Sequence, residues 1–196
     1  MFAKLFRRKS DIRTSIIVAH IAARLQPVQR GEFFEDPLDA SLVALGLGSV
    51  TGGRTELTDD PIGIRSCDVE ISPKDTAEQT IREIINILER LGAPKGSEIR
   101  IQDQEPVPFG VLEGMAVLLD GTGLPRQVYE QSDINSTLAG LSKALLGKGQ
   151  LRGHWEGSRE TSLYFYGASF AEMRDAATTF ASADPLCAQC RIEQIA

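Results

Sequence analysis

The chain has 196 residues, of which 42% are hydrophobic and 24% charged, so it can bury a substantial core without disulfide or metal staples. Its three cysteines are too few for a disulfide framework, which favours a reducing compartment such as the cytoplasm. No run approaches the roughly 20 apolar residues that cross a bilayer, so no membrane span is expected. The apolar stretch 16–23 follows basic residues, but it is short and contains His20, which favours a buried first strand over a signal peptide.

Charge is unevenly distributed along the chain. Residues 1–30 hold seven basic side chains and one acid, a net charge of +6, so residues 31–196 carry −12. We call residues 31–196 the acidic body. It repels phosphates and favours basic partners, and nucleic-acid binding is not expected. The alternative is that the acidity only keeps the protein soluble.

The first half predicts a strand, a helix and a hairpin in that order. Asp36-Pro37 predicts the start of a short helix that ends at Gly46. Residues 49–57 and 64–71 predict two strands, and the turn-rich connection between them predicts a hairpin.

A long helix and a short strand complete this unit. Ser72-Pro73-Lys74-Asp75 predicts the helix start, because Ser72 can cap free amides and Pro73 suits the first helical position. An apolar stripe that includes Ile84 continues to a stop at Gly92. Residues 98–102 predict a strand, and residues 103–113 predict a linker.

The second half repeats this order. It predicts a strand at 115–120, a helix capped by Ser132-Asp133, a hairpin of 150–155 with 161–166, a helix opened by Ser169 and a final strand at 191–195.

When the two halves are aligned with a shift of about 96 positions, apolar residues fall at corresponding places in corresponding elements. Examples are Leu42 with Leu138 and Ile99 with Ile195. The predicted fold class is therefore α+β, a tandem duplication of a ferredoxin-like βαββαβ unit with antiparallel sheets. The predicted organisation is a basic arm at 1–14, a first unit at 15–102, a linker at 103–113 and a second unit at 114–196. Whether the two units stack their sheets or join them at an edge stays open.

The glycine-dense stretch 46–53 invites comparison with a phosphate loop. A phosphate loop leaves a strand and enters a helix, whereas this stretch leaves a helix and enters a strand. A bulged strand is the favoured interpretation. Ligand binding by Gly48, Gly52, Gly53 and Arg54 is the alternative.

Cys187 and Cys190 have the spacing of a redox motif. The pair follows a helix instead of opening one, and a zinc site would need two further ligands. Buried or incidental thiols are the favoured interpretation, and no metal or cofactor is predicted.

With only two histidines, arrangements for acid–base catalysis are scarce, and no catalytic residue is predicted. His154 is followed by Trp155 and Glu156 in the second hairpin. Asp68 and Glu70 alternate on one face of a strand, as paired carboxylates for acid–base chemistry would, and a solvated outer face explains them equally well.

Aromatic residues give no nucleic-acid signature either. Tyr164, Phe165 and Tyr166 follow one another, so Phe165 is expected in one layer and the two tyrosines in the other.

Two short motifs carry a family resemblance. Residues 45–55 (LGLGSVTGGRT) and 91–97 (LGAPKGS) resemble segments of uncharacterised small bacterial proteins, some of polymorphic-toxin immunity type. The resemblance implies a bacterial cytosolic protein that works by binding, and it carries over no catalytic residues.

Three functional hypotheses follow. The first is a non-enzymatic protein-binding module, such as an inhibitor or immunity protein for a basic partner. Its contacts are expected on the two hairpins, at Glu56, Asp59, Asp60, Trp155 and Glu156. The second is a small-molecule sensor that holds its ligand between the two units near the glycine segment. The third is a hydrolase-like enzyme that uses His154 with Glu156 or Asp68; oligomer formation is left open.

Overall fold

The computed structural model describes residues 16–196, in which the predicted series of elements occurs twice. The predicted basic arm at 1–14 lies outside these residues. The first unit contains β1 (Ile17–Ile21), α1 (Pro27–Arg30), the π-helical segment η1 (Gly31–Glu35), α2 (Asp36–Leu45), β2 (Gly48–Thr58), β3 (Gly63–Pro73), α3 (Glu78–Arg90), β4 (Ser97–Arg100) and β5 (Val107–Phe109). The second contains β6 (Glu113–Asp120), α4 (Arg126–Gln131), α5 (Ile134–Ala144), β7 (Gly149–Glu156), β8 (Glu160–Gly167), α6 (Phe170–Ala181), the 3-10 turn η2 (Pro185–Cys187) and β9 (Arg191–Gln194).

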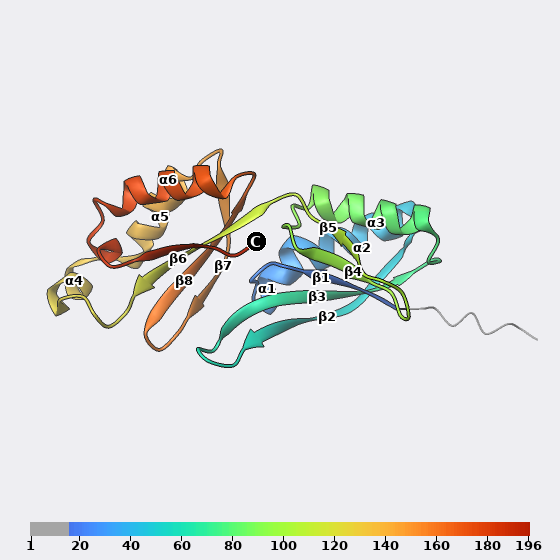
Figure 1. Cartoon of the computed structure of the whole chain (residues 1–196), viewed down its shortest axis with the longest axis horizontal. Coiled ribbons are helices and arrows are strands. Elements are labelled where there is room, and N and C mark those ends of the chain that lie inside the picture. The colour runs from blue at the N-terminus through green and yellow to red at the C-terminus, as the bar shows by residue number, and fades with distance from the viewer. Residues whose placement is uncertain (1–15) are drawn as a thin grey trace, which may run out of the picture.

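Both units form an antiparallel sheet with the same order of four strands, which β5 extends at one edge of the first sheet. The first sheet has the order β2-β3-β1-β4-β5, and the second has the order β7-β8-β6-β9. In each, the opening strand lies between the second hairpin strand and the strand that follows the long helix, β4 or β9, which is the ferredoxin-like arrangement. The predicted fold class is confirmed, and Figure 1 shows the two units side by side along the long axis.

The strand pairing agrees with the shift of about 96 positions. Ile17 pairs with Ile71 in the first sheet, and the residues 96 positions later, Glu113 and Gly167, pair in the second. Ala19 pairs with Ile99, and Met115, which lies 96 positions after Ala19, pairs with Gln194, which lies 95 positions after Ile99. The last strand is therefore displaced by one residue from a constant shift.

The predicted start of the long helix at Ser72 is wrong. Ser72 and Pro73 continue β3 and pair with β2, and α3 begins only at Glu78. Pro73 ends a strand here, a position that suits it as well as the first turn of a helix does. Asp75 accepts a hydrogen bond from the backbone N–H of Ala77 at 3.1 Å and so satisfies one of the free amides before α3.

The predicted helix start at Asp36-Pro37 is wrong as well, because helical residues run without a break from Pro27 through η1 into α2, and Glu35 already has helical angles. Three other predicted helix boundaries are confirmed. Gly46 ends α2 with a left-handed φ of 61°. The side chain of Asp133 caps α5 by accepting the Asn135 N–H, and Ser169 caps α6 by accepting the Glu172 N–H. Residues 103–113 contain β5, which pairs with β4, so part of this interval belongs to the first sheet.

Each hairpin carries a bulge near its start. Thr51 is the extra residue in β2, and Arg152 is the extra residue in β7. A bulge bends its strand and redirects the extra side chain. The guanidinium of Arg152 donates to the backbone oxygens of Leu91 and Gly92 at 3.0 and 3.1 Å, and thereby ties the second hairpin to the first unit.

The first unit covers part of the open face of the second sheet. As expected, Phe165 lies in the core beneath α5 and α6, while Tyr164 and Tyr166 belong to the same buried cluster as the first unit's core. The segment between β1 and α1 crosses this face closely, since a Cβ on Gly153 would lie 2.6 Å from the backbone oxygen of Arg24. The two sheets remain separate, and this crossing segment joins the units.

One hydrogen bond at this junction gives a testable prediction. Tyr166 Oη accepts the backbone N–H of Arg24 at 2.7 Å, so Tyr166→Phe leaves that amide without its partner. We expect a loss of about 1–3 kcal/mol in the free energy of unfolding, measured by urea titration. Tyr164→Phe is the control, because the Tyr164 hydroxyl makes no hydrogen bond within residues 16–196. Equal losses in the two variants would contradict the assignment.

Candidate functional site: a groove between the two hairpins

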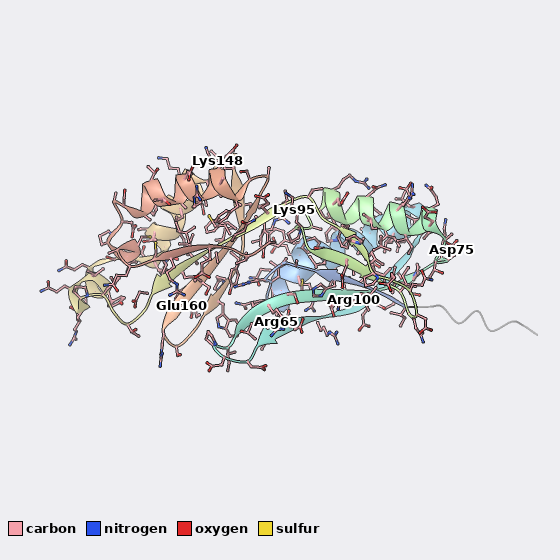
Figure 2. The ribbon with its side chains drawn as sticks, in the orientation of Figure 1. Arg65, Asp75, Lys95, Arg100, Lys148 and Glu160 are labelled. Atoms are coloured by element: carbon pink, nitrogen blue, oxygen red, sulfur yellow. The ribbon has the colours of Figure 1, made fainter. Side chains whose placement is uncertain are left out.

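A groove of about 1190 Å³ lies between the tip of the first hairpin and the open face of the second sheet. The turn from Thr58 to Ile64 forms one wall, and the β7–β8 hairpin forms the other. Residues of β6 and β9 form the floor and far edge. In Figure 2, the labelled Glu160 marks the second-unit side, and Arg65 marks β3 near the tip of the first hairpin.

Carboxylates outnumber cationic groups in this groove. Six acids and three arginines line it, so its formal charge is −3. The acids are Asp59, Asp60, Asp120, Glu156, Glu160 and Glu193, and the bases are Arg24, Arg159 and Arg191. The excess of acids gives the groove a net negative potential, which attracts a ligand of opposite sign.

Part of this charge is neutralised internally at the β9 edge. The guanidinium of Arg191 lies 3.0 Å from a carboxylate oxygen of Glu160 and 3.1 Å from one of Glu193. Asp120 accepts the backbone N–H groups of Thr122 and Gly123, which lowers the pKa of its carboxyl below the usual range. These carboxylates are engaged in holding the second unit together.

Three carboxylates on the hairpins remain unengaged. Asp59, Asp60 and Glu156 form no side-chain hydrogen bond or ion pair with any residue from 16 to 196, and all three are exposed. They lie on the walls contributed by both units. A cation that enters the groove therefore meets carboxylates that do not have to leave another partner.

Trp155 supplies an aromatic surface beside these carboxylates. Its ring is half-buried and packs against the core cluster shared by the two units. Its indole N–H is buried and finds no acceptor in the described part of the chain. An amphipathic ring that is already partly fixed is suited to anchor a ligand at low entropic cost.

The structure brings four of the five predicted partner-binding residues together. Asp59, Asp60, Trp155 and Glu156 all line the groove. Glu56 does not; it lies further along β2 and accepts a hydrogen bond from Ser66 Oγ at 2.9 Å.

His154 is directed away from the groove. It lies opposite Leu163, whose side chain belongs to the core beneath the helices, whereas Trp155 lies opposite Ser162 on the open face. Successive residues of a strand point to opposite faces, so His154 and Trp155 serve different surfaces.

The interpretation of Asp68 as part of a solvated face is wrong. Its side chain is only 5% exposed and lies between two partners. His20 Nδ1 is 2.8 Å from one carboxylate oxygen, and the guanidinium of Arg54 is 2.8 Å from the other. Asp68 thus connects three strands of the first sheet, and both of its oxygens are occupied.

The predicted alternative ligand site does not coincide with the groove. Gly48, Gly52, Gly53 and Arg54 lie on β2 outside the lining. Gly53 has a packing role, because a Cβ there would lie 2.2 Å from a carboxylate oxygen of Glu35.

A buried ion pair lies beneath Gly53. The Arg30 guanidinium is 2.8 Å from Glu35 and donates to Thr55 Oγ1 at 3.0 Å. The thiol of Cys67 is buried nearby, and the loss of solvent around it raises its pKa to about 12, so it is neutral at physiological pH. This cluster stabilises the first unit and does not reach the groove.

Residues 16–196 contain no group of three or more His, Cys, Asp or Glu side chains placed to hold a metal ion. Over the same range, no helix is both long enough and apolar enough to span a membrane.

Comparisons with known proteins give limited guidance. No protein-family model and no curated protein matches the chain. Among solved structures, an unknown protein from Galdieria sulphuraria is 10% identical with a TM-score of 0.31, over 92% of this chain and 96% of that chain. Regulatory subunits of aspartate kinase from Thermus flavus and Thermus thermophilus (ligand free form) are each 13% identical, with TM-scores of 0.28 and 0.27. They cover 85% and 87% of this chain and 92% and 93% of theirs. The fold rests on this chain's own strand order.

Proposed function

We propose that this chain is a non-enzymatic binding module that takes a basic segment of another protein into the groove between its hairpins. The observation that carries the proposal is the set of three unengaged carboxylates beside Trp155, contributed by both units. A basic segment would satisfy these carboxylates, and its apolar atoms would cover the indole ring.

The net charge of the chain also favours a basic partner, because electrostatic attraction acts over longer distances than direct contacts do. The groove has a formal charge of −3, and the acidic body has −12. Such a field accelerates encounter with a cationic protein, and this acceleration decreases as salt shortens the Debye length to about 8 Å at physiological strength. Binding through the groove therefore carries a steep salt dependence, which purely apolar recognition lacks.

An inhibitor or immunity-type protein that sequesters a basic enzyme fits this proposal. The resemblance carried by residues 45–55 and 91–97 supports this narrower version. An acidic module that occupies the site of a basic enzyme needs surface complementarity and no catalytic residues of its own.

A small organic cation is a second candidate ligand. The groove is somewhat larger than the roughly 300–1,000 Å³ of typical small-molecule pockets, and both units form its walls. Thermal shift measurements with cationic metabolites distinguish the candidates, because a small ligand that binds only the native state raises the melting temperature once its concentration exceeds its dissociation constant.

Charge reversal at the groove tests the proposal. In pull-downs from lysate of the native host, Asp59→Lys with Asp60→Lys is expected to lose the basic protein that the wild type retains. The variant places two cations on one wall, which turns attraction into repulsion.

The matched control is Glu83→Lys with Glu105→Lys, which changes the net charge equally. Glu83 lies on α3 and Glu105 between β4 and β5, and neither residue lines the groove. This variant is expected to retain the partner. Retention by both variants with unchanged salt sensitivity would remove the groove carboxylates from recognition.

A further inference from the structure

Cys187 and Cys190 occupy the two ends of one tight turn. Cys187 is the last residue of η2, and the backbone N–H of Cys190 donates to the Cys187 carbonyl oxygen at 3.0 Å. A turn closed in this way holds its end Cα atoms within about 7 Å. Disulfides span Cα separations of about 4.4–6.8 Å, so this turn is compatible with a bond between the two sulfurs.

The two thiols share one environment but differ in access. Cys187 belongs to the second core and is 4% exposed, whereas Cys190 packs against that core and is half-buried. Both line an open cavity of about 740 Å³ between α6 and β9, on which Arg174 and Asp184 also lie. The remaining cysteine, Cys67, is fully buried in the first unit and belongs to the other core cluster.

Their protonation states also differ. A hydrogen bond from the Cys187 thiol lowers the pKa of Cys190 to about 7, and the same interaction together with burial raises the pKa of Cys187. The thiolate is the nucleophilic form, so this direction of the shift and the greater exposure of Cys190 both favour attack by Cys190 first.

We propose that Cys187 and Cys190 form a redox-active dithiol that reacts with small disulfides such as oxidised glutathione. The Cys190 thiolate attacks one sulfur of the small disulfide, the S–S bond breaks, and one small thiolate leaves. Cys187 then loses its proton and attacks the Cys190 sulfur, which breaks the mixed disulfide and releases the second small thiolate. Both leaving groups end as thiols, and two electrons have passed from the protein to the small disulfide.

This inference is independent of the groove and replaces the interpretation of the pair as incidental thiols. Its signature is the order of events, in which the exposed sulfur reacts first and the buried sulfur resolves the adduct. An accessible nucleophile next to a resolving cysteine is the arrangement of redox-sensitive sites.

The test incubates the folded chain with oxidised glutathione at neutral pH and follows its intact mass. The wild type is expected to lose the mass of two hydrogens, and peptide mapping is expected to place the disulfide between residues 187 and 190 with Cys67 unmodified. In Cys187→Ala, a glutathione adduct is expected to persist on Cys190, because the resolving thiol is gone.

Cys190→Ala is the matched variant for the other sulfur, and little adduct is expected there because Cys187 is buried. Two outcomes would overturn the inference. One is a lasting adduct on Cys190 in the wild type, which would mean that Cys187 cannot reach it. The other is a wild type that keeps both thiols after incubation, while the same thiols react once the chain is unfolded in urea.

Discussion

Replacing Ile84 with aspartate is expected to lower the free energy of unfolding by about 4 kcal/mol, because it buries a carboxylate that has no partner. Ile84 lies in the middle of α3, is fully buried and belongs to the core beneath the first sheet. Urea titration monitored by far-UV circular dichroism measures the loss as a decrease in the denaturation midpoint.

Asn86→Asp is the matched control for this change. Asn86 lies two residues further along α3 on its exposed side, so the same charge is added to the same helix without burial. A change within about 0.5 kcal/mol is expected there. If both variants unfold at the wild-type midpoint, the buried face of α3 has been assigned wrongly.

Removing the positive charge of Arg30 is expected to cost about 3 kcal/mol, because it leaves the Glu35 carboxylate without its partner. The side chains of the pair are 10% and 20% exposed, which places the effect at the lower end of the range for buried pairs. Arg30→Met retains most of the apolar stem that packs below β2. The loss is measured by urea titration as above.

The neutral double variant separates charge from packing. Arg30→Met with Glu35→Gln is expected to be more stable than Arg30→Met alone, because no uncompensated charge remains. Arg126→Met breaks the exposed pair with Glu130, whose side chains are 90% and 55% exposed, and it is expected to change little. If the double variant loses as much stability as Arg30→Met and Glu35→Gln lose when their separate losses are added, the ion pair is not the source of the effect.

Local sequence patterns predicted most of the fold. A short apolar stretch located β1, the predicted hairpin of 150–155 with 161–166 located β7 and β8, and polar residues such as Asp133 and Ser169 located helix starts, because these signals depend only on near neighbours. The start of α3 was misplaced because Ser72 and Pro73 suit a strand end as well as a helix start. The pairing with β2 that decides between them comes from the other strand of the hairpin.

Long-range contacts account for what the sequence did not reveal. The burial of Asp68 depends on His20, which lies 48 residues away in the chain, and on Arg54, which lies 14 away. The groove depends on the segment around Arg24 crossing the second sheet, so the roles of Arg24 and Tyr164 in its lining had no local signal. The composition of the turn in the first hairpin was the only sequence signal that placed Asp59 and Asp60 among the candidate site residues.

Site-specific photo-crosslinking tests the central claim most directly. A photoreactive amino acid is placed at Ser158, which lines the groove, or at Gln104, which lies between β4 and β5 outside it. After irradiation in the native host, the Ser158 position is expected to capture a basic protein, and Asp59→Lys with Asp60→Lys is expected to abolish the capture. A partner that crosslinks at Gln104 and never at Ser158 would contradict binding through the groove.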